Sequence, residues 1–325
     1  LIPKLLNGGE VERIVAIDRT ATKVRDSRVQ RLVGDMRDLD LRRAVEGIDV
    51  LVHLAFMTEL DHIGDVQQRA NREMTQRLLD AAVQVPHLVV LSSATVYGAW
   101  PNNPTPITEA ALVRPNPGFA YAVHKAEVER MLSAWRGENP NVSVSILRPT
   151  VSVAPGEISW LGAHLLAASV IWVGDEDPDW QFLAQEDLVS AIEVAIDRRI
   201  NGAYNVAPDG YLSSEQRRAL LGVRPRFRVS EAIAEFGARW RSRPLPEGIV
   251  PYTMHSWVIS NSRLRAEGWV PRTTNEEAFV EVDPAPPWAS MNAKQKQYLS
   301  LAGAGALLTG LLVAVVVLVR RHLRG

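Results

Sequence analysis

The sequence contains no cysteine, and neither sign of charge dominates its 325 residues. The absence of cysteine excludes disulfides, thiolate metal sites and a cysteine nucleophile. Lys and Arg together number 36, and Asp and Glu number 37, so no net field draws the chain to nucleic acid and we expect none as a partner. The seven histidines are scattered without ligand-like spacing, and we therefore predict no metal site.

A glycine-rich phosphate loop is also missing from the beginning of the chain. Residues 1–6 are typical of the end of a helix, Asn7-Gly8-Gly9 of its cap, and Ile14–Ile17 of a buried strand. In βαβ units that hold phosphates, a strand and a G-x-x-G-x-x-G loop come before this helix. We expect either an N-terminal truncation, which we favour, or a degenerate relative that holds no pyrophosphate. A sheet without that strand would have two unpaired edges in its middle.

Two motifs, separated by residues 99–120, carry the chemistry that the sequence predicts. Ser92-Ser93-Ala94-Thr95-Val96-Tyr97-Gly98 closes the apolar run Leu88–Leu91, and Tyr121-Ala122-Val123-His124-Lys125 opens an amphipathic helix. A lysine one turn beyond a tyrosine shares its helix face, so the lysine charge can lower a phenol pKa that is ordinarily about 10. Tyr121 could then take a proton from a substrate hydroxyl while hydride leaves the same carbon. Ser93, at a strand end, could hold that hydroxyl.

Each motif has an ordinary structural explanation when it is taken alone. A Tyr-x-x-x-Lys pair is often only a surface pair on a helix, and two serines after a strand often serve a turn or an N-cap. In this order and spacing they resemble an extended short-chain dehydrogenase/reductase of the NAD-dependent epimerase/dehydratase family. The resemblance implies an enzyme with NAD as cofactor and Ser93, Tyr121 and Lys125 as the catalytic set, with Lys125 also on the nicotinamide ribose. Because the phosphate loop is missing, we expect the chain as written to bind NAD poorly.

The remaining N-terminal pattern alternates strands and helices. It predicts an α/β fold, a Rossmann-like doubly wound parallel sheet lacking its first strand. Asp18-Arg19 ends a strand where, in such sheets, an acidic side chain contacts the adenosine ribose; a plain turn is the other interpretation. The resemblance puts Asp35 and Met36 on adenine, and a helix N-cap is the competing role for Asp35. The run Val50–Ala55 predicts a strand buried on both faces, and small Ala55 would let the cofactor lie close.

Two further matches and two departures complete the resemblance. Arg148-Pro149 matches the family's Leu-Arg-Pro, and Asn71-Arg72-Glu73-Met74-Thr75 stands where the family has Asn-x-x-Gly-Thr. The expected cofactor-binding residues are Asp18, Arg19, Asp35, Met36, Leu54, Ala55, Asn71, Tyr121, Lys125, Arg148 and Pro149. Thr150–Ala154 lacks the Asn of many sugar epimerases, which weakens the case for a nucleotide sugar. The apolar run Trp160–Val173 is either a helix over a hydrophobic ligand or, as we favour, core. Asp187 is expected to be structural.

The chain is expected to divide into several parts. We expect an NAD-binding domain over residues 1–156, to which residues 181–207 return. A substrate region would comprise residues 157–180 and 208–282. After it we expect a linker (283–297), a transmembrane helix (298–319) and a basic tail (320–325). The span has 22 residues without a charge, about 33 Å as a helix at roughly 1.5 Å per residue. The basic tail mildly favours a cytoplasmic C-terminus. We favour the opposite orientation, in which a single-pass anchor holds the catalytic domain on the cytoplasmic side, because NAD is available in the cytoplasm.

Three functions remain open from the sequence. The first is NAD-dependent epimerisation, dehydration or oxidation of a sugar, with a nucleotide-linked sugar favoured. The second is oxidation of a lipophilic alcohol at a membrane, such as a 3β-hydroxysteroid or a polyprenyl-linked sugar. The third is a non-catalytic protein that keeps the fold. The expected partners are a small-molecule substrate and, through the anchor, a membrane, while a homodimer is left open.

Overall fold

The structure is a computed structural model. It describes residues 1–8, 10–57, 65–155, 157–159, 161–163, 165, 171–173, 177–221, 227–229 and 248–282. The chain divides into two units, Leu1–Val282 and Asp283–Gly325, and every described residue belongs to the first. The expected linker, transmembrane span and basic tail, residues 283–325, therefore lie outside the described residues. Among the helices that are described, none combines the length and the apolar character needed to cross a bilayer.

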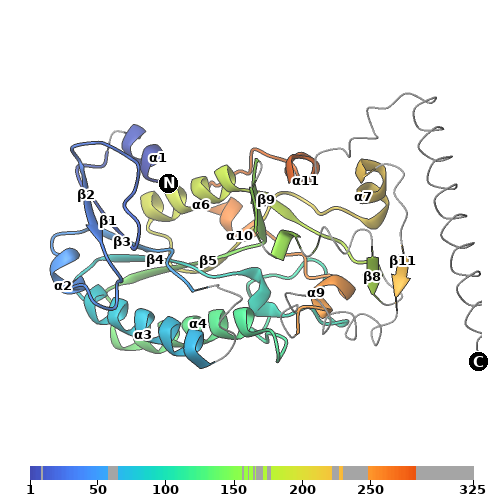
Figure 1. Cartoon of the computed structure of the whole chain (residues 1–325), viewed down its shortest axis with the longest axis horizontal. Helices are drawn as coiled ribbons and strands as arrows, with labels where there is room; N and C mark the ends of the chain where they lie inside the picture. Colours follow the sequence, from blue (N-terminus) through green and yellow to red (C-terminus); the bar gives the residue numbers. More distant parts are fainter. Residues whose placement is uncertain are drawn as a thin grey trace, which may run out of the picture. The chain divides into compact units, whose positions relative to one another are not determined.

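Two parallel sheets form the centre of the domain that was expected to bind NAD (Figure 1). The smaller sheet pairs β1 (Ile14–Asp18) with β2 (Val29–Val33). The larger one has the strand order β10 (Gly202–Val206), β5 (Ser143–Pro149), β4 (His87–Leu91) and β3 (Val50–His53), with all pairs parallel. Within the described part of the chain, β1 bonds only to β2, and β3 only to β4.

The larger sheet is covered by helices on both faces, as a doubly wound fold requires. Side chains alternate along β4, so Leu88 and Val90 pack against α3 (Asp65–Ala82) and α4 (Ala120–Glu138). Val89, between them, faces α6 (Gln185–Arg198) instead. In Figure 1, α3 and α4 lie on one side of the strands and α6 lies on the other. Each fully buried aliphatic side chain contributes about 1.5–3 kcal/mol, which makes this layered core the main source of stability.

Two short helices near the smaller sheet contact the helices that cover the larger one: α1 contacts α6, and α2 contacts α3. Helix α1 (Ile2–Asn7) begins the chain, and its Lys4 forms an ion pair of 3.0 Å with Glu193 of α6. Helix α2 (Leu41–Ala44) begins at Asp40, whose carboxylate accepts a hydrogen bond from the Arg43 amide. The N-cap is therefore Asp40, and the alternative role considered for Asp35 as the cap of this helix is wrong.

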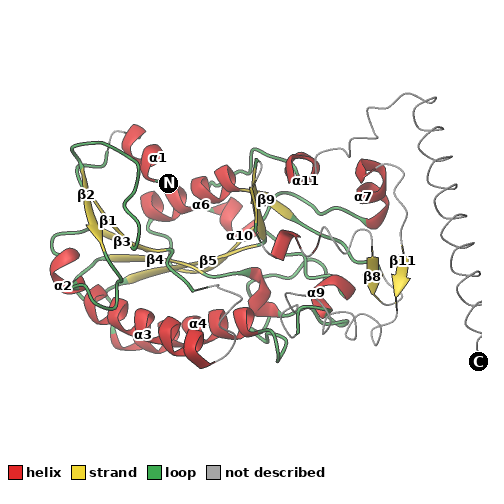
Figure 2. Cartoon of the chain, viewed as in Figure 1, coloured by secondary structure: helices red, strands yellow, loops and turns green. Residues whose placement is uncertain are grey.

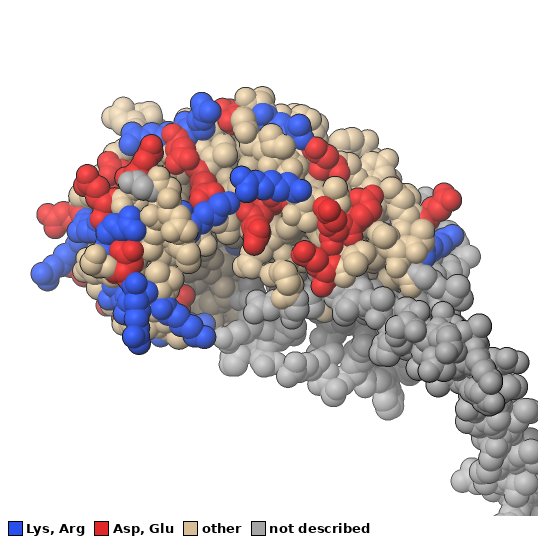
Figure 3. Space-filling view, turned by 90° about the horizontal axis from the view of Figure 1, so that it is seen from above, with Lys and Arg blue, Asp and Glu red and all other residues tan. Residues whose placement is uncertain are grey.

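The rest of the first unit contains short strands and helices around an aromatic core (Figure 2). Strand β6 (Val151–Ala154) pairs in parallel with β9 (Phe182–Ala184) and antiparallel with β7 (Glu157–Ile158). The other elements here are η1 (Ala94–Tyr97), β8 (Ile171–Val173), α7 (Ser214–Leu221), β11 (Phe227–Val229), α9 (Pro251–Met254), α10 (Ser262–Ala266) and α11 (Asn275–Val282). On the face shown in Figure 3, acidic and basic side chains are interspersed over the described surface, in keeping with their near-equal numbers.

Two expectations about this part of the chain can be checked. In the apolar run Trp160–Val173, Leu161 and Leu165 are buried in the aromatic core, as favoured. The end of the run is not helical, because Ile171–Val173 are β-forming residues that pair in parallel with Phe227–Val229. Asp187 is structural as expected, since its carboxylate accepts hydrogen bonds of 2.9 Å from the amides of Arg272 and Thr273.

Candidate active site

The two motifs meet at the carboxyl edge of the larger sheet. Ser93 follows β4 and is the N-cap of η1, where its hydroxyl oxygen accepts hydrogen bonds from the Thr95 amide (3.2 Å) and the Thr95 hydroxyl (2.9 Å). Tyr121 lies in the first turn of α4, and its side chain is hydrogen-bonded to that of Ser93. Because the Ser93 oxygen already accepts from Thr95, its own proton is available for the phenol oxygen.

Lys125 lies one turn further along α4 and is buried. Its ammonium donates a hydrogen bond of 2.8 Å to the carbonyl of Leu91, the last residue of β4. The same ammonium lies 3.8 Å from the centre of the Phe56 ring, a cation–π contact. Phe56 also meets the Tyr121 ring edge-on, with centroids 5.6 Å apart. One aromatic ring therefore contacts both Tyr121 and Lys125.

The electrostatics of this pair differ in part from the expectation. Burial raises the pKa of Tyr121 above its ordinary value, and the hydrogen bond from Ser93 opposes that rise. Lys125 was expected to lower this pKa, but the net shift is upward because burial outweighs the hydrogen bond with Ser93. The Lys125 ammonium contacts the Leu91 carbonyl and the Phe56 ring. Burial also lowers the pKa of Lys125 to about 7, and the charge of Glu129 acts in the opposite direction.

Glu129 and Arg148 form a buried ion pair directly beneath this site. The Arg148 guanidinium donates to both carboxylate oxygens of Glu129, at 2.9 and 2.5 Å, and the side chains are only 7% and 6% exposed. Ser92 donates a further hydrogen bond of 2.5 Å to the same carboxylate. Burial alone would lower the pKa of Arg148, but the hydrogen bonds and charge of Glu129 outweigh it and raise the pKa.

The ion pair continues into a hydrogen-bonded chain that reaches β10. Arg148 donates to the Tyr97 hydroxyl at 2.7 Å, and that hydroxyl donates to the Asn205 side chain at 2.8 Å. The guanidinium also lies over the Tyr97 ring, 4.9 Å from its centre. Burial raises the pKa of Tyr97 to about 12, so this phenol stays protonated near neutral pH. Sequence reasoning passed over Glu129, although its position four residues beyond Lys125 on one helix face was a readable signal.

The residues expected near adenosine are tied to their own loops. Asp18 is exposed and accepts a hydrogen bond of 2.8 Å from the amide of Thr20, which is the turn that was the alternative interpretation. Neighbouring Arg19 is also exposed. Asp35 is held by Arg37 through hydrogen bonds of 3.0 and 2.7 Å, which lower the pKa of Asp35 to about 2. Met36 packs between two apolar clusters.

The residues expected near nicotinamide lie closer to the two motifs. Leu54, 43% exposed, and Ala55 follow β3 and lead directly to Phe56. Asn71 is buried on α3 and holds this segment, because its amide group bonds the backbone N–H and carbonyl of Met57, at 2.9 and 3.3 Å. Pro149 is buried at the end of β5. Arg148 lies beside it, but the hydrogen bonds of its guanidinium are made to Glu129 and Tyr97.

These contacts allow a test of how well the residues fit NAD. An ammonium has three donors, and the described residues provide one hydrogen-bond acceptor to Lys125, so donors remain for ribose hydroxyls. The exposed Leu54-Ala55 backbone adjoins this position. The nicotinamide end of the cofactor therefore fits, provided that Phe56 turns away from Lys125. For the phosphates, the sequence offers no glycine-rich cradle. Among the described residues, no group of His, Asp and Glu side chains is placed to hold a metal ion.

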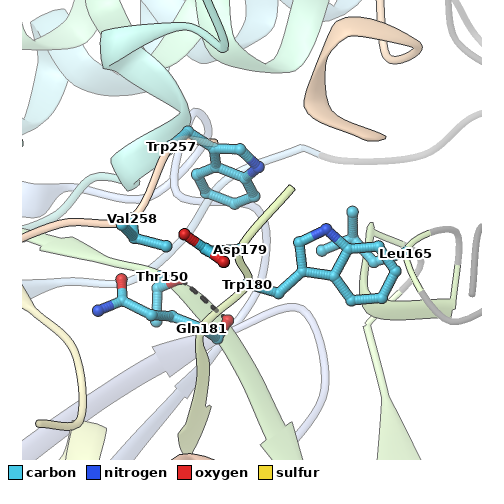
Figure 4. A pocket seen from close by; sticks show the side chains of 7 residues that line it. All are labelled: Thr150, Leu165, Asp179, Trp180, Gln181, Trp257 and Val258. Atoms are coloured by element: carbon cyan, nitrogen blue, oxygen red, sulfur yellow. Dashed lines mark hydrogen bonds between the residues drawn. The ribbon is translucent and has the colours of Figure 1, made fainter. Parts of the chain in front are cut away.

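A small pocket lies beyond the end of β5, and its side chains leave no room for a water molecule inside it (Figure 4). It is lined by Thr150, Leu165, Asp179, Trp180, Gln181, Trp257 and Val258. Figure 4 shows both indole rings and the Asp179 carboxylate around the same space, with the hydrogen bond from Thr150 to the Gln181 carbonyl at 3.2 Å beneath them. Burial raises the pKa of Asp179. The Trp180 indole N–H is buried without a hydrogen-bond partner. No motif in the sequence predicted that these two tryptophans would line a common pocket.

Aromatic contacts connect this pocket to Tyr121. Trp257 meets the Tyr252 ring at 5.4 Å, Tyr252 meets Phe119 at 4.9 Å, and Phe119 meets Tyr121 at 5.9 Å between centroids. The Tyr252 hydroxyl donates to the Thr95 carbonyl at 2.8 Å, which fixes this cluster to η1. The pocket and the Ser93–Tyr121 pair therefore belong to one packed region.

Comparisons with known proteins agree with the family inferred from the motifs. The sequence profile of the "NAD dependent epimerase/dehydratase family" matches residues 1–207. Mycobacterium tuberculosis (strain H37Rv) has a relative, "Uncharacterized protein Rv0501", that is 23% identical over 300 residues, covering 86% of this chain and 78% of the relative. The expectations of an enzyme and of NAD as the cofactor agree with this family.

Solved structures share the fold. MoeE5 in complex with UDP-glucuronic acid and NAD is 24% identical, with a TM-score of 0.63 over 86% of this chain and 92% of that one. UDP-glucuronic acid 4-epimerase from Bacillus cereus in complex with NAD is 16% identical, with a TM-score of 0.64 over 86% and 92%. The dTDP-glucose 4,6-dehydratase DesIV from Streptomyces venezuelae, with NAD and TYD bound, is 20% identical, with a TM-score of 0.65 over 86% and 90%. At these identities the likeness shows the Rossmann-like α/β fold.

Proposed function

The chain belongs to the NAD-dependent epimerase/dehydratase family, and on that premise we propose that it transfers hydride between NAD and a hydroxyl-bearing carbon of a sugar, favouring a nucleotide-linked one. The observation that carries the proposal is the hydrogen bond between Ser93 and Tyr121 at the carboxyl edge of the sheet, with Lys125 one turn away. Ligands of doubly wound sheets bind at this edge. Substrates of the related structures, UDP-glucose, UDP-glucuronic acid and dTDP-glucose, are the first compounds to test.

The chemistry assigned to the three side chains follows from their contacts. Ser93 holds the substrate hydroxyl, and Tyr121 takes the proton of that hydroxyl as the carbon gives up its hydride and a carbonyl forms. The nicotinamide ring, when bound, accepts the hydride. In the reverse direction the protonated phenol of Tyr121 returns the proton to the carbonyl oxygen. A phenol with a raised pKa suits that second role, because it holds its proton until a carbonyl oxygen develops charge.

Lys125 has two tasks in this proposal. Its unused N–H donors bind ribose hydroxyls of the cofactor beside Leu54 and Ala55, and its charge stabilises the phenolate of Tyr121. Both tasks require the Phe56 ring to turn away from the ammonium that it now covers. At the adenosine end, Asp18 is the exposed carboxylate that could accept ribose hydroxyls, whereas the Asp35 carboxylate is engaged by Arg37.

A second candidate substrate is a lipophilic alcohol. Two indole rings and Leu165 line the pocket beyond β5, and none of its described lining residues is a cation that could bind a diphosphate, but the pocket would have to open to admit such an alcohol. The uncharged run 298–319 in the sequence adds to this alternative, because an anchor would bring the enzyme to membrane-soluble alcohols. A single-pass anchor with the catalytic unit on the cytoplasmic side therefore remains part of the proposal. A non-catalytic role remains the third alternative, which the turnover experiment tests. A homodimer is compatible with each of the three functions.

The decisive experiment is turnover of the three nucleotide sugars and of a 3β-hydroxysteroid with NAD, by the parent chain and by Tyr121→Phe. We expect the variant to lose about 10²–10⁴-fold in rate, because the group that moves the proton is gone. Tyr204→Phe is the matched control, since its hydroxyl bonds Glu267 away from Ser93. Epimerisation or dehydration leaves NAD unchanged overall, whereas a dehydrogenase accumulates NADH. Turnover by Tyr121→Phe at the rate of the parent chain would overturn the proposal, whereas turnover of none of the four compounds by the parent chain would favour the non-catalytic alternative.

A further inference from the structure

Helix α4 contacts the end of β4 at two points, one turn apart. Lys125 donates its hydrogen bond to the Leu91 carbonyl, and Glu129 accepts one from the Ser92 hydroxyl. The next residue after this stretch is Ser93, whose backbone conformation begins η1. The position of Ser93 relative to Tyr121 therefore depends on how α4 holds residues 91 and 92. Glu129 supplies one of these two contacts.

The Glu129 carboxylate is itself held in a fixed orientation. Arg148 binds both of its oxygens from β5 and donates to the Tyr97 hydroxyl of η1, which in turn donates to the Asn205 side chain of β10. A bidentate, buried pair of this kind has little rotational freedom. The network therefore connects α4, the turn after β4, and two neighbouring strands through one carboxylate.

Glu129 is also the anionic side chain whose charge acts on Lys125. Burial removes the ammonium from water, and Glu129 offsets that loss. The other groups recorded around Lys125 among the described residues are the Leu91 carbonyl, the Phe56 ring and His53 of β3. Burial and Lys125 together lower the pKa of His53 to about 4, so this histidine is neutral at pH 7. Neither the ring nor the histidine supplies a negative charge.

We propose that Glu129 is a positioning residue for the catalytic set: it fixes the turn that carries Ser93 through Ser92, and from four residues along the same helix its carboxylate favours the charged form of Lys125. The inference rests on the proposed function, in which Ser93, Tyr121 and Lys125 touch substrate or cofactor. Its electrostatic part can be measured without either ligand. Glu129 does not reach the reacting atoms in this account, because both of its oxygens are already engaged.

The first test measures the charge state of Lys125 directly. The chain has only five lysines, Lys4, Lys23, Lys125, Lys294 and Lys296. Biosynthetic labelling of lysine with ¹³C at Cε gives few NMR signals, and Lys125→Arg identifies the one of interest. In the parent chain we expect that signal to titrate near pH 7. In Glu129→Gln, which keeps the shape and an acceptor oxygen but removes the charge, we expect a midpoint about one unit lower.

The matched control is Glu127→Gln on the same helix. Glu127 bonds Gln68 and pairs with Arg72 and Arg130, so its charge faces other partners. We expect this variant to leave the Lys125 midpoint unchanged. Glu129→Gln also leaves Arg148 without its anion, which destabilises the folded chain. The double variant Glu129→Gln/Arg148→Met removes both charges and is expected to show the same lowered midpoint. An unchanged midpoint in the folded variants would overturn the electrostatic part.

The second test concerns the turn that carries Ser93. Ser92→Ala removes the hydrogen bond to Glu129 while keeping the carboxylate and its charge. We expect about a tenfold lower kcat, an unchanged Lys125 midpoint, and no shift in the pH profile of kcat. Glu129→Gln, in contrast, should also move the alkaline limb of that profile to lower pH, since Lys125 loses its proton earlier. Unchanged kcat in Ser92→Ala would overturn the positioning part.

The two kinds of failure are distinguishable. The Lys125 midpoint is measured without NAD or substrate, so it tests Glu129 even if Tyr121→Phe retains full activity. In that case the proposed function fails while the electrostatic link between Glu129 and Lys125 stands. If Tyr121→Phe abolishes activity but neither Glu129→Gln nor Ser92→Ala alters the midpoint or kcat, only the present inference fails.

Discussion

The two sheets differ in how deeply the charged residues at their strand ends are buried. At the carboxyl edge of β4 and β5, Glu129 and Arg148 are buried, and hydrogen bonds join them to Ser92, to Tyr97 of η1 and, through Tyr97, to Asn205 of β10. At the ends of β1 and β2, the carboxylates of Asp18 and Asp35 accept hydrogen bonds from residues two positions further along the chain. The difference follows from pairing, because a strand covered on both faces and paired on both sides excludes water, whereas an edge strand does not. This packing therefore holds the Ser93–Tyr121 part of the proposed site in place, whereas the part expected to bind adenosine, at Asp18 and Asp35, lacks such packing.

The largest expected effect comes from breaking the buried ion pair. Arg148→Met leaves Glu129 as an unpaired buried charge, and we expect the free energy of unfolding to fall by about 3–5 kcal/mol. Urea denaturation followed by circular dichroism at pH 7 measures this loss. A loss below about 1 kcal/mol would show that the pair is no more buried than a surface pair, and the contrast between the two sheets would disappear.

The next effect depends on pH. An unfolded lysine titrates near 10.5, and burial lowers the pKa of Lys125 to about 7. Between these values the unfolded chain binds a proton that the folded chain has lost, so this group makes the free energy of unfolding rise with pH, by at most about 1.4 kcal/mol per unit. Lys125→Met removes that contribution. Denaturation at pH 7, 8 and 9 should show a steeper rise for the parent than for the variant, whereas exposed Lys23→Met should behave like the parent.

A smaller effect is expected at Asn71, which links α3 to the segment after β3. Asn71→Ala removes the hydrogen-bond partner of the half-buried N–H and carbonyl of Met57, at a cost of about 1–3 kcal/mol. The same variant should weaken NAD binding, because Leu54 and Ala55 belong to that segment. Calorimetric titration with NAD measures it. Unaltered stability together with unaltered NAD affinity would show that the segment is held by other contacts.

The smallest effect is expected at the smaller sheet. Asp35 and Arg37 form a bidentate pair, but their side chains are 21% and 35% exposed. We expect Arg37→Met to change the free energy of unfolding by no more than about 1 kcal/mol, since water and salt screen such a pair. The measurement is the same urea denaturation as for Arg148→Met, at low and at high salt. A loss comparable to that of Arg148→Met would contradict the comparison between the sheets.

Much of the fold could be predicted from the chain alone. The runs Ile14–Ile17, Val29–Val33 and Leu88–Leu91 all lie in strands, because apolar β-forming residues in runs of this length have few other ways to bury themselves. The helix predicted to open at Tyr121 runs from Ala120 to Glu138. The apolar run Trp160–Val173 contributes to the core, as favoured, but it also ends in a strand that neither alternative included, because periodicity alone does not separate a short strand from a helix segment.

The candidate site was predictable only in part. Ser93 and Tyr121 could be named because each belongs to a short motif with a fixed place on a strand end and a helix start. The Trp180–Trp257 pocket could not, because its lining comes from segments far apart in the sequence and no local pattern connects them. The pKa of Tyr121 could not be predicted either. Burial depends on everything packed around a group, and here it outweighs the effect expected from a lysine one turn away.

The sequence by itself determined the order of strands and helices, the absence of cysteine chemistry, and the identity of a serine, a tyrosine and a lysine suited to moving a proton. These properties depend on residue type and on spacing within one element. Only the tertiary structure decided that Glu129 and Arg148 share a dry interior, that Phe56 covers Lys125, and that Asp18 and Asp35 remain near water. Those outcomes depend on which elements meet and how much water they exclude, and exclusion of water sets the strength of every charge in the site.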